Sequence, residues 1–190
     1  SQSLITALWA DSVFESRLLA AMMLGKLNIP SDEFEQTATL FISQSNDPEI
    51  LEILLSQGLK RHREHNPDSF LRMVSAWVAT HNDKMTDHAF SALVHHARED
   101  HDLNLPEIIK ISLPPFRSSP AVFQPTMVDL IGAIYERSEA ETIYLVRQLF
   151  ADPMPSIMPA VFRRITTQLP SDLQPTIIEI LREKAPLVKK

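Results

Sequence analysis

Residues 4–27 read LITALWADSVFESRLLAAMMLGKL, and this stretch contains the pattern that decides the fold. A first apolar run ends at Trp9, a polar break follows at Asp11 and Ser12, and a second apolar run fills residues 14–27. The apolar spacing in both runs is typical of helices rather than strands. We therefore predict two helices joined by a short turn, with Asp11-Ser12 capping the second helix and Glu15 completing a capping box.

Similar pairs of predicted helices recur along the chain, and in the second pair Asp47 is predicted to cap the second helix, with Pro48 at its first position. The first helix of each pair closes with an aromatic residue, and the successive aromatics lie 32, 36, 39 and 34 residues apart: Trp9, Phe41, Trp77, Phe116 and Phe150. A helical unit of this length is typical of α-solenoids, in which each unit buries its apolar face by stacking on its neighbours. The run from Asp11 through Val13 and Arg17 into Ala-rich apolar residues also resembles the HEAT repeat.

The repeated pattern predicts an all-α fold: a HEAT-like right-handed α-solenoid, or α-α superhelix, of about five helical-hairpin units. Residues 171–184 are predicted to form the capping helix of the array. Pro114-Pro115 is predicted to stop a short helix over residues 105–113, and the proline-rich residues 114–125 are the best candidate for a bend. We nevertheless expect a single domain over residues 1–190. Because the chain does not begin with Met, we expect it to be a fragment of a longer chain or to have a processed terminus.

The composition is that of an ordinary globular protein, with 44% apolar and 22% charged residues among 190. There is no cysteine, so a disulfide framework and a thiolate metal site are excluded, and a cytoplasmic location is expected. Since no apolar run approaches the roughly 18 residues that a membrane span needs, we predict no membrane association. The net charge is −6, made up of −5 in residues 1–60, −2 in residues 61–102 and +1 in residues 103–190. Any basic surface that binds nucleic acid must therefore be confined to a small part of the protein.

All seven histidines fall between His62 and His101, and His62 and His65 would share a helical face. A metal site can be built from such a pair, but the chain has no HExxH motif and no carboxylate at an obvious ligand spacing. Histidines at helix ends and turns explain the bias more simply, and we predict no metal. Three glycines can hardly build a nucleotide-cradling loop, so no cofactor is expected either.

Two groups of basic residues are candidates for phosphate contact. One is the cluster of Lys60, Arg61 and Arg63, and the other contains Arg163 and Arg164 with Arg137 upstream. If the second helices of successive units line one face, basic residues would form a broken stripe along it, at Lys26, Lys60, Arg63, Arg98, Arg137 and Arg163. A solvated helical face explains the same residues with fewer assumptions.

Trp77 occupies the same position in its predicted unit as Trp9 does in the first unit. Equivalent aromatics that close the first helix of each unit are most simply packing residues between helices. The functional alternative is an aromatic cleft in which Trp77 stacks on a base or a cationic group.

Residues 9–24, from Trp9 through the helix with Glu15 and Arg17 to the Leu- and Ala-rich run, resemble the DNA alkylation repair family of HEAT-like proteins. The helical course from Leu4 to about Leu181 is also similar. The resemblance implies a HEAT-like fold and a link to alkylated DNA. Glycosylases of that family excise positively charged alkylated bases, using a concave basic groove, aromatic side chains and an aspartate.

The family's aspartate, which follows a helix-end Trp by four residues, has no match here. The position four residues after Trp77 is His81, and the nearest acid is Asp83, which becomes the candidate catalytic residue. After Trp9 the acid comes two residues on, at Asp11, where it looks like a helix cap. The missing match favours a non-catalytic relative.

Our leading hypothesis from the sequence is a non-enzymatic scaffold or protein-interaction module with a protein partner. It depends on the period near 35 residues, the missing nucleophile motifs and the net negative charge. The alternative from another class is a DNA-lesion-binding protein or a DNA glycosylase of the alkylation repair family. A third option is a structural segment of a longer protein whose function lies elsewhere in that chain.

Overall fold

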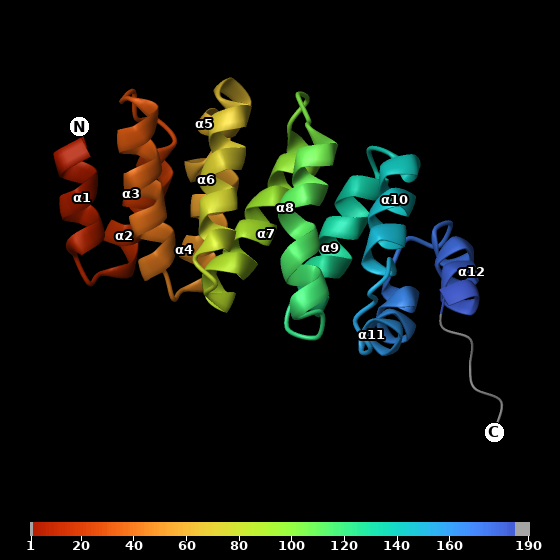
Figure 1. Ribbon diagram of the computed structural model, residues 1–190. Helices are drawn as coiled ribbons and strands as arrows, with labels where there is room; N and C mark the ends of the chain where they lie inside the picture. Colours follow the sequence, from red (N-terminus) through yellow and green to blue (C-terminus); the bar gives the residue numbers. More distant parts are fainter. Residues whose placement is uncertain (1, 185–190) are drawn as a thin grey trace. The chain divides into compact units, whose positions relative to one another are not determined.

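The computed structural model describes residues 2–184, and every regular element in that range is helical (Figure 1). In chain order the α-helices are α1 (Gln2–Ala10), α2 (Phe14–Leu24), α3 (Ser31–Gln44), α4 (Pro48–Ile53), α5 (Lys60–His65), α6 (Pro67–Ala79), α7 (Asp83–Glu99), α8 (Leu105–Ser118), α9 (Gln124–Tyr135), α10 (Glu139–Leu149), α11 (Met158–Ile165) and α12 (Gln174–Lys184). A π-helical turn, Leu54–Gly58, lies between α4 and α5, and a 3₁₀ turn, Thr166–Gln168, follows α11. The prediction of an all-α chain is confirmed.

The chain divides into two compact units, Ser1–Leu103 (unit 1) and Asn104–Lys190 (unit 2). The division falls between α7 and α8, so it precedes the proline-rich residues 114–125 where the sequence indicated a bend. Those residues lie inside unit 2. The prediction of a single domain over residues 1–190 stays a prediction.

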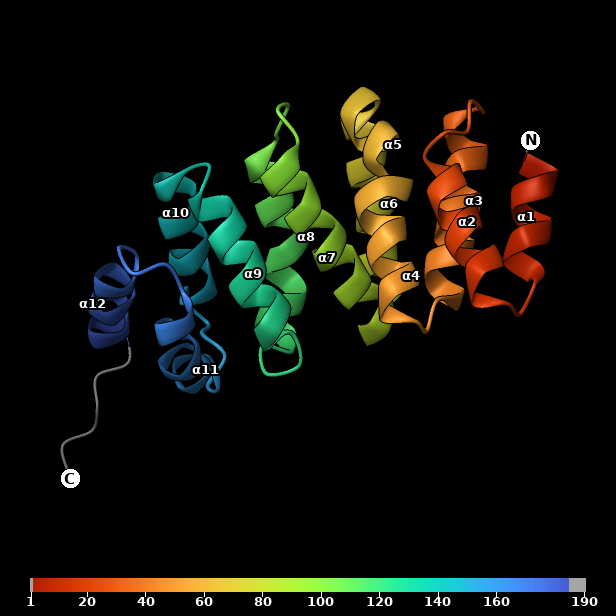
Figure 2. The same cartoon turned by 180° about the vertical axis from the view of Figure 1, so that it is seen from behind.

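In unit 1, α1, α3 and α6 lie side by side (Figures 1 and 2). Their closing aromatics form part of the core. Trp9 and Phe41 stack with 4.2 Å between ring centroids and 9° between ring planes. The Trp77 indole nitrogen donates a hydrogen bond to Thr39 Oγ1 on α3, at 2.8 Å. All three aromatics are buried, with 0–3% of their surface exposed. Packing of these side chains therefore joins each of the helices to its neighbour.

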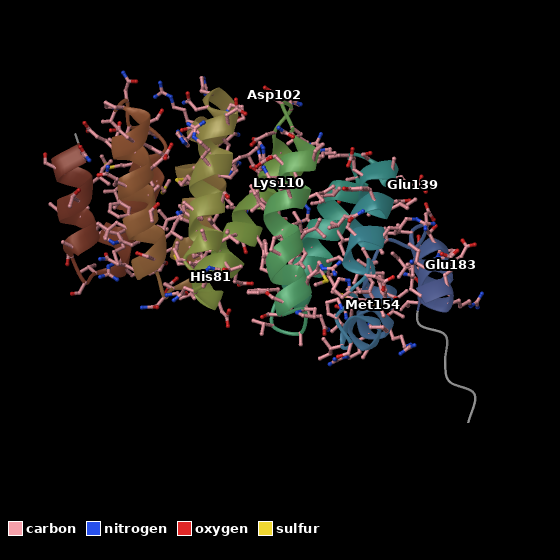
Figure 3. All side chains as sticks on the ribbon, viewed as in Figure 1. His81, Asp102, Lys110, Glu139, Met154 and Glu183 are labelled. Carbon is pink, nitrogen blue, oxygen red and sulfur yellow. The ribbon has the colours of Figure 1, made fainter. Side chains whose placement is uncertain are left out.

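Unit 1 has two edges, which we name by their connections. The turn edge contains residues 11–13, 45–47 and 80–82, and the loop edge contains residues 25–30, 66 and 100–103. His81 marks the turn edge and Asp102 the loop edge at the two ends of α7 (Figure 3). A candidate ligand site lies at each edge.

Close backbone packing brings α2 against the π-helical turn. A Cβ atom added to Gly25 would lie 2.3 Å from the Gln57 carbonyl oxygen, and one added to Gly58 would lie 3.1 Å from that of Ala21. Gly25 therefore needs to be glycine for the two backbones to approach so closely, whereas a Cβ at Gly58 would require a shift of a few tenths of an ångström. A π-helical turn contains one residue more than an α-helical turn would, so it changes which side chains of α5 face the interior.

Helix α8 continues through Pro114 and Pro115 to Ser118, so the prediction that these prolines stop it is wrong. Tertiary contacts on the last turn compensate for the hydrogen bonds that the prolines cannot make. Phe116 is fully buried, and the Arg117 guanidinium donates to the backbone carbonyls of Gln148 in the last turn of α10 and of Ala151 and Pro153 after it. Within unit 2, α10 also packs against α8, α9 and α12.

The helix caps agree only in part with the sequence prediction. Asp47 caps α4 as predicted, accepting from the backbone N–H groups of Glu49 and Ile50, with Pro48 at the first helical position. The N-cap of α2 is Val13, and no side chain caps it. Asp11 instead accepts from the Val13 N–H and the Ser16 hydroxyl, because its side chain folds the turn that precedes the helix.

None of the helices in residues 2–184 combines the length and apolar character that crossing a membrane would require.

Candidate functional site

An open cleft of about 300 Å³ lies at the turn edge of unit 1, where α1, α2 and α4 converge. Its lining comes from the end of α1, the first turn of α2 and the α3–α4 connection: Trp9, Arg17, Ser45, Asn46, Asp47, Pro48 and Ile50. The stack of Trp9 on Phe41 joins α1 to α3 beside the cleft. A cleft with one cation and one carboxylate suits a polar ligand that carries charge.

Arg17 covers the Trp9 ring and forms the cationic wall of the cleft. Its Cζ atom lies 5.6 Å from the ring centroid, within the range of a cation–π contact. Its Nε donates to the carbonyl oxygens of Trp9 and Asp11, at 3.2 and 3.0 Å. Among residues 2–184, no acceptor is bound to its two terminal nitrogens, which leaves them for an acceptor in the cleft.

Asp47 supplies the carboxylate of the cleft. Its Oδ1 accepts the two capping hydrogen bonds from Glu49 and Ile50, at 2.9 and 3.2 Å. In the described part of the chain no donor binds the other oxygen, Oδ2, and no cation pairs with the group. The neighbouring Asn46 accepts a hydrogen bond from Lys84 Nζ, at 2.7 Å, which places a second cation beside the cleft.

A second polar group lies in the interior of unit 1, between α5 and α7. Arg63 is 1% exposed and its guanidinium binds three partners: Asp100 Oδ2 at 3.1 Å, Glu99 Oε2 at 2.6 Å and the Leu55 carbonyl oxygen at 2.5 Å. His96 Nδ1 also bonds to Asp100 Oδ2, at 2.7 Å. The sequence placed Arg63 in a surface cluster for phosphate contact, and the structure corrects that position. The π-helical turn before α5 rotates Arg63 inward, where Leu55 and Asp100 satisfy it.

The pKa of the Asp100 carboxyl is lower than its ordinary value. Burial raises this pKa, but the hydrogen bond from His96 and the charge of Arg63 together outweigh burial. Asp100 is therefore ionised and completes a buried ion pair. Such a pair holds α5 and α7 in one arrangement, which is a structural task rather than a catalytic one.

Burial lowers the pKa of His62 and of His88. At His62 the carboxylate of Glu35 opposes this effect without cancelling it, while Arg72 adds to it. At His88 the charge of Lys84 adds to burial. Both imidazoles are therefore neutral near pH 7.

Residues 2–184 contain no group of three or more His, Cys, Asp or Glu side chains able to hold a metal ion.

The two residues that the sequence proposed for a base-binding cleft differ in burial. Trp77 is 1% exposed at the end of α6, and its position agrees with the packing interpretation. Asp83 is exposed at the first residue of α7. His81 between them adopts a left-handed φ of 53° that ends α6, and it is exposed (Figure 3). Neither Trp77 nor Asp83 lines the cleft at the turn edge.

The remaining basic candidates lie at the surface. In unit 1, Lys60 and Arg61 are exposed on α5, and Lys60 pairs with Glu64 at 3.9 Å. In unit 2, Arg137 follows α9, while Arg163 and Arg164 lie on α11; all are exposed. The predicted stripe is interrupted at Arg63, which is buried. Ligand binding by the exposed residues stays a prediction.

Sequence reasoning did not select Arg17 or Asp47 as site residues. Asp47 was predicted only as a helix cap, which is true of one of its two oxygens. The lining residues of the cleft come from segments about 30 residues apart, and nothing local indicates that Trp9 and Asp47 meet. The useful signal was the repeat itself, since the ends of successive first helices lie at one edge.

Comparison with known proteins gave one match. A family model described as DNA alkylation repair enzyme matches residues 1–152, which include α1 to α10. Searches of curated proteins and of solved structures found no match. These findings do not support a non-enzymatic scaffold, and they favour the alternative that links the chain to DNA.

Proposed function

Because the chain belongs to the DNA alkylation repair enzyme family, we propose that it binds DNA carrying positively charged alkylated bases. We propose the cleft at the turn edge of unit 1 as the place where such a base is held. The observation that carries this proposal is the meeting of the Asp47 carboxylate, the Arg17 guanidinium and the Trp9 side chain in one open cleft.

The free oxygen of Asp47 provides attraction for a cationic base. An alkylated purine with a positive ring is stabilised beside a carboxylate, whereas an unmodified base gains nothing from that charge. Arg17 can donate to a ring carbonyl or a neighbouring phosphate. Recognition would therefore depend on the charge of the lesion.

The charge of unit 1 also favours selectivity for the lesion over general DNA affinity. Residues 1–103 contain eight Lys and Arg against fifteen Asp and Glu, a net charge of −7. Such a unit gains little from the phosphate backbone, whose neutralisation supplies most non-specific affinity. We expect weak binding to unmodified duplex and a clear preference for a duplex with a cationic base.

The fold is part of the same proposal. We propose that the helical pairs form a HEAT-like α-solenoid, which is supported by the buried aromatic at the end of each first helix. An experimental structure would test this directly, because a solenoid requires the same rotation from each pair to the next.

The proposed function is tested with two duplexes that differ only by one N7-methylguanine. Fluorescence anisotropy at low and moderate salt measures binding to each duplex. We expect tighter binding to the methylated duplex, and we expect Asp47→Asn to remove most of that preference. Asn caps helices about as well as Asp, so this variant keeps the fold while removing the charge.

The matched control is Asp83→Asn, which removes a carboxylate from the same edge outside the cleft. It should retain the preference, and loss of preference in this variant alone would move the site to Asp83. Release of the methylated base, abolished in Asp47→Asn, would make the protein a glycosylase. Binding without release would make it a lesion-binding protein. Equal affinity for the two duplexes would contradict the proposal.

A further inference from the structure

A second pocket, of about 120 Å³, lies at the loop edge of unit 1. Its walls come from the α2–α3 connection, the first turn of α3 and the end of α5: Gly25, Leu27, Asn28, Ile29, Ser31, Phe34, Arg61, His62, His65 and Asn66. The lining contains one arginine, two histidines, two asparagines and a serine, but no carboxylate. Its polar character is therefore that of a site for an anion.

The close approach of Gly25 to Gln57 builds the pocket. Because a Cβ at Gly25 would lie 2.3 Å from the Gln57 carbonyl oxygen, only glycine lets the α2–α3 connection pack so tightly against this segment. The π-helical turn that contains Gln57 also sets the rotation of α5, which directs Arg63 into the core. Arg61 and His65, on the same short helix, remain exposed at the pocket.

Several hydrogen-bond donors around the pocket lack a partner among residues 2–184. Arg61 forms no ion pair with any of the described residues, and the Asn66 side chain makes no capping hydrogen bond to α6. Helix α3 begins at Ser31 after Pro30, whose side chain cannot cap it, so its first N–H groups are also available. Asp32 and Glu33 follow in the first turn, but they are exposed and do not line the pocket.

His62 gives independent evidence of a ligand. Its imidazole is 5% exposed, lines the pocket and stacks on Phe34 with 4.6 Å between centroids. Within residues 2–184 its Nε2 has no hydrogen-bond partner, and the nearest carboxylate oxygen, Glu35 Oε1, is 3.6 Å away. Leaving a buried polar group unpaired is costly, and such groups are common where a ligand completes the bonding.

We propose that this pocket binds a phosphoryl group. A volume of about 120 Å³ equals that of about four waters, which suits a tetrahedral oxyanion and is too small for a nucleoside. Arg61 provides the charged fork, Asn66 and the first N–H groups of α3 provide neutral donors, and His62 closes the inner wall. The group can come from free phosphate or from the end or backbone of a nucleic acid. The site lies at the opposite edge from the cleft, and its assignment does not rest on the proposed function.

Binding of the anion should be coupled to uptake of a proton by His62. The charged groups that act on this imidazole are Glu35 from α3 and Arg72 from α6, and Arg61 and His65 on its own helix line the same pocket. A phosphoryl group beside it adds a negative charge, which favours the protonated form. For an oxyanion whose own charge is constant over this range, such as sulfate, affinity should therefore rise as the pH falls from 7.5 to 6.

The experiment titrates the protein with inorganic phosphate at constant ionic strength and follows the imidazole resonances of His62 and His65 by NMR. We expect saturable shifts of both resonances. Arg61→Gln should weaken binding by about tenfold, the value of one charge-assisted contact. The matched control is Lys60→Gln, which removes the same charge from the adjacent exposed position outside the pocket, and it should change affinity by less than about twofold.

A second arm identifies the source of the phosphoryl group. An oligonucleotide with a 5′-phosphate and the same oligonucleotide without it are compared as competitors of bound inorganic phosphate. Displacement of phosphate by the phosphorylated oligonucleotide alone assigns the site to nucleic-acid ends, displacement by both oligonucleotides assigns it to the backbone, and displacement by neither assigns it to the free ion. Equal weakening by Arg61→Gln and Lys60→Gln, or shifts that never saturate, would overturn the proposal. Loss of cleft binding by Asp47→Asn would leave this result unchanged, so the two proposals fail separately.

Discussion

Arg63 and Asp100 form an ion pair inside unit 1, with 3.1 Å between Nε and Oδ2 and both side chains buried. The pair joins α5 to α7 across 37 residues of sequence. The other guanidinium nitrogens bond to Glu99 and Leu55, and His96 bonds to the same Asp100 oxygen as Arg63, so the two charges act within a network rather than alone.

We predict that Asp100→Ala lowers the free energy of unfolding by about 3–5 kcal/mol, because it leaves the buried Arg63 charge unpaired. Urea unfolding measures the change. The double variant Arg63→Met, Asp100→Leu should recover much of the loss, since replacing both partners removes the unpaired charge. A loss below about 1 kcal/mol in Asp100→Ala would show that solvent reaches Arg63 and that the pair is not a buried one.

Unit 1 should lose stability as the pH falls from 7.5 to 5.5. The pKa values of His62 and His88 are lowered in the folded state, so the unfolded chain binds more protons over this range. The stabilisation that the two neutral imidazoles contribute is fully present above about pH 6.5, the ordinary pKa of histidine in an unfolded chain, and it is lost as the pH falls toward their folded pKa values. Over this range the free energy of unfolding falls by at most about 1.4 kcal/mol per pH unit for each group. Urea unfolding followed by tryptophan fluorescence reports on unit 1, which contains both tryptophans. His88→Leu should reduce the slope, and an unchanged slope would exclude His88 as a source.

Two glycine substitutions should have opposite effects. Gly25→Ala places a Cβ 2.3 Å from a backbone oxygen, and we expect a loss of about 1–3 kcal/mol from the resulting shift of α2. Gly132→Ala, inside α9, meets nothing within 4 Å and should gain about 0.5–1 kcal/mol through helix propensity. Thermal unfolding of the two variants checks both signs. A Gly25→Ala protein as stable as the parent would mean that α2 and the π-helical turn can separate without cost.

Trp77→Ala should cost about 3–5 kcal/mol, because the side chain fills the space between α6 and α3. Trp77→Phe should cost less, since it retains most of the ring and loses mainly the hydrogen bond to Thr39, worth about 1 kcal/mol. Thermal melts distinguish packing from ligand binding. An alanine variant that melts within about 2 °C of the parent would contradict the packing interpretation.

Much of the fold could be predicted from the sequence because helices and their ends depend on local interactions. The apolar period predicted the helices, and Asp47-Pro48 predicted the start of α4. The closing aromatics Trp9, Phe41 and Trp77 were predicted as packing residues, and all are buried. The prolines of α8 were misjudged because bonds from Arg117 to a distant segment stabilise that helix end.

The candidate sites were less predictable. Asp83 and Trp77 were selected for their order in the sequence, whereas the cleft contains Asp47 beside Trp9 and Arg17. The basic cluster at residues 60–63 was read as one surface group. In the structure Arg61 lines a pocket while Arg63 pairs with Asp100.

The sequence by itself determined that the chain is helical, where most helices begin and end, and which aromatics enter the core. These features follow from interactions within about four residues along the chain. Only the tertiary structure decided which polar side chains meet. One extra residue in the π-helical turn rotates every side chain that follows it in α5, and Gly25 allows α2 to approach that turn. The position of Arg63, the pocket at the loop edge and the cleft at the turn edge depend on contacts between residues more than 30 positions apart, which local periodicity does not encode.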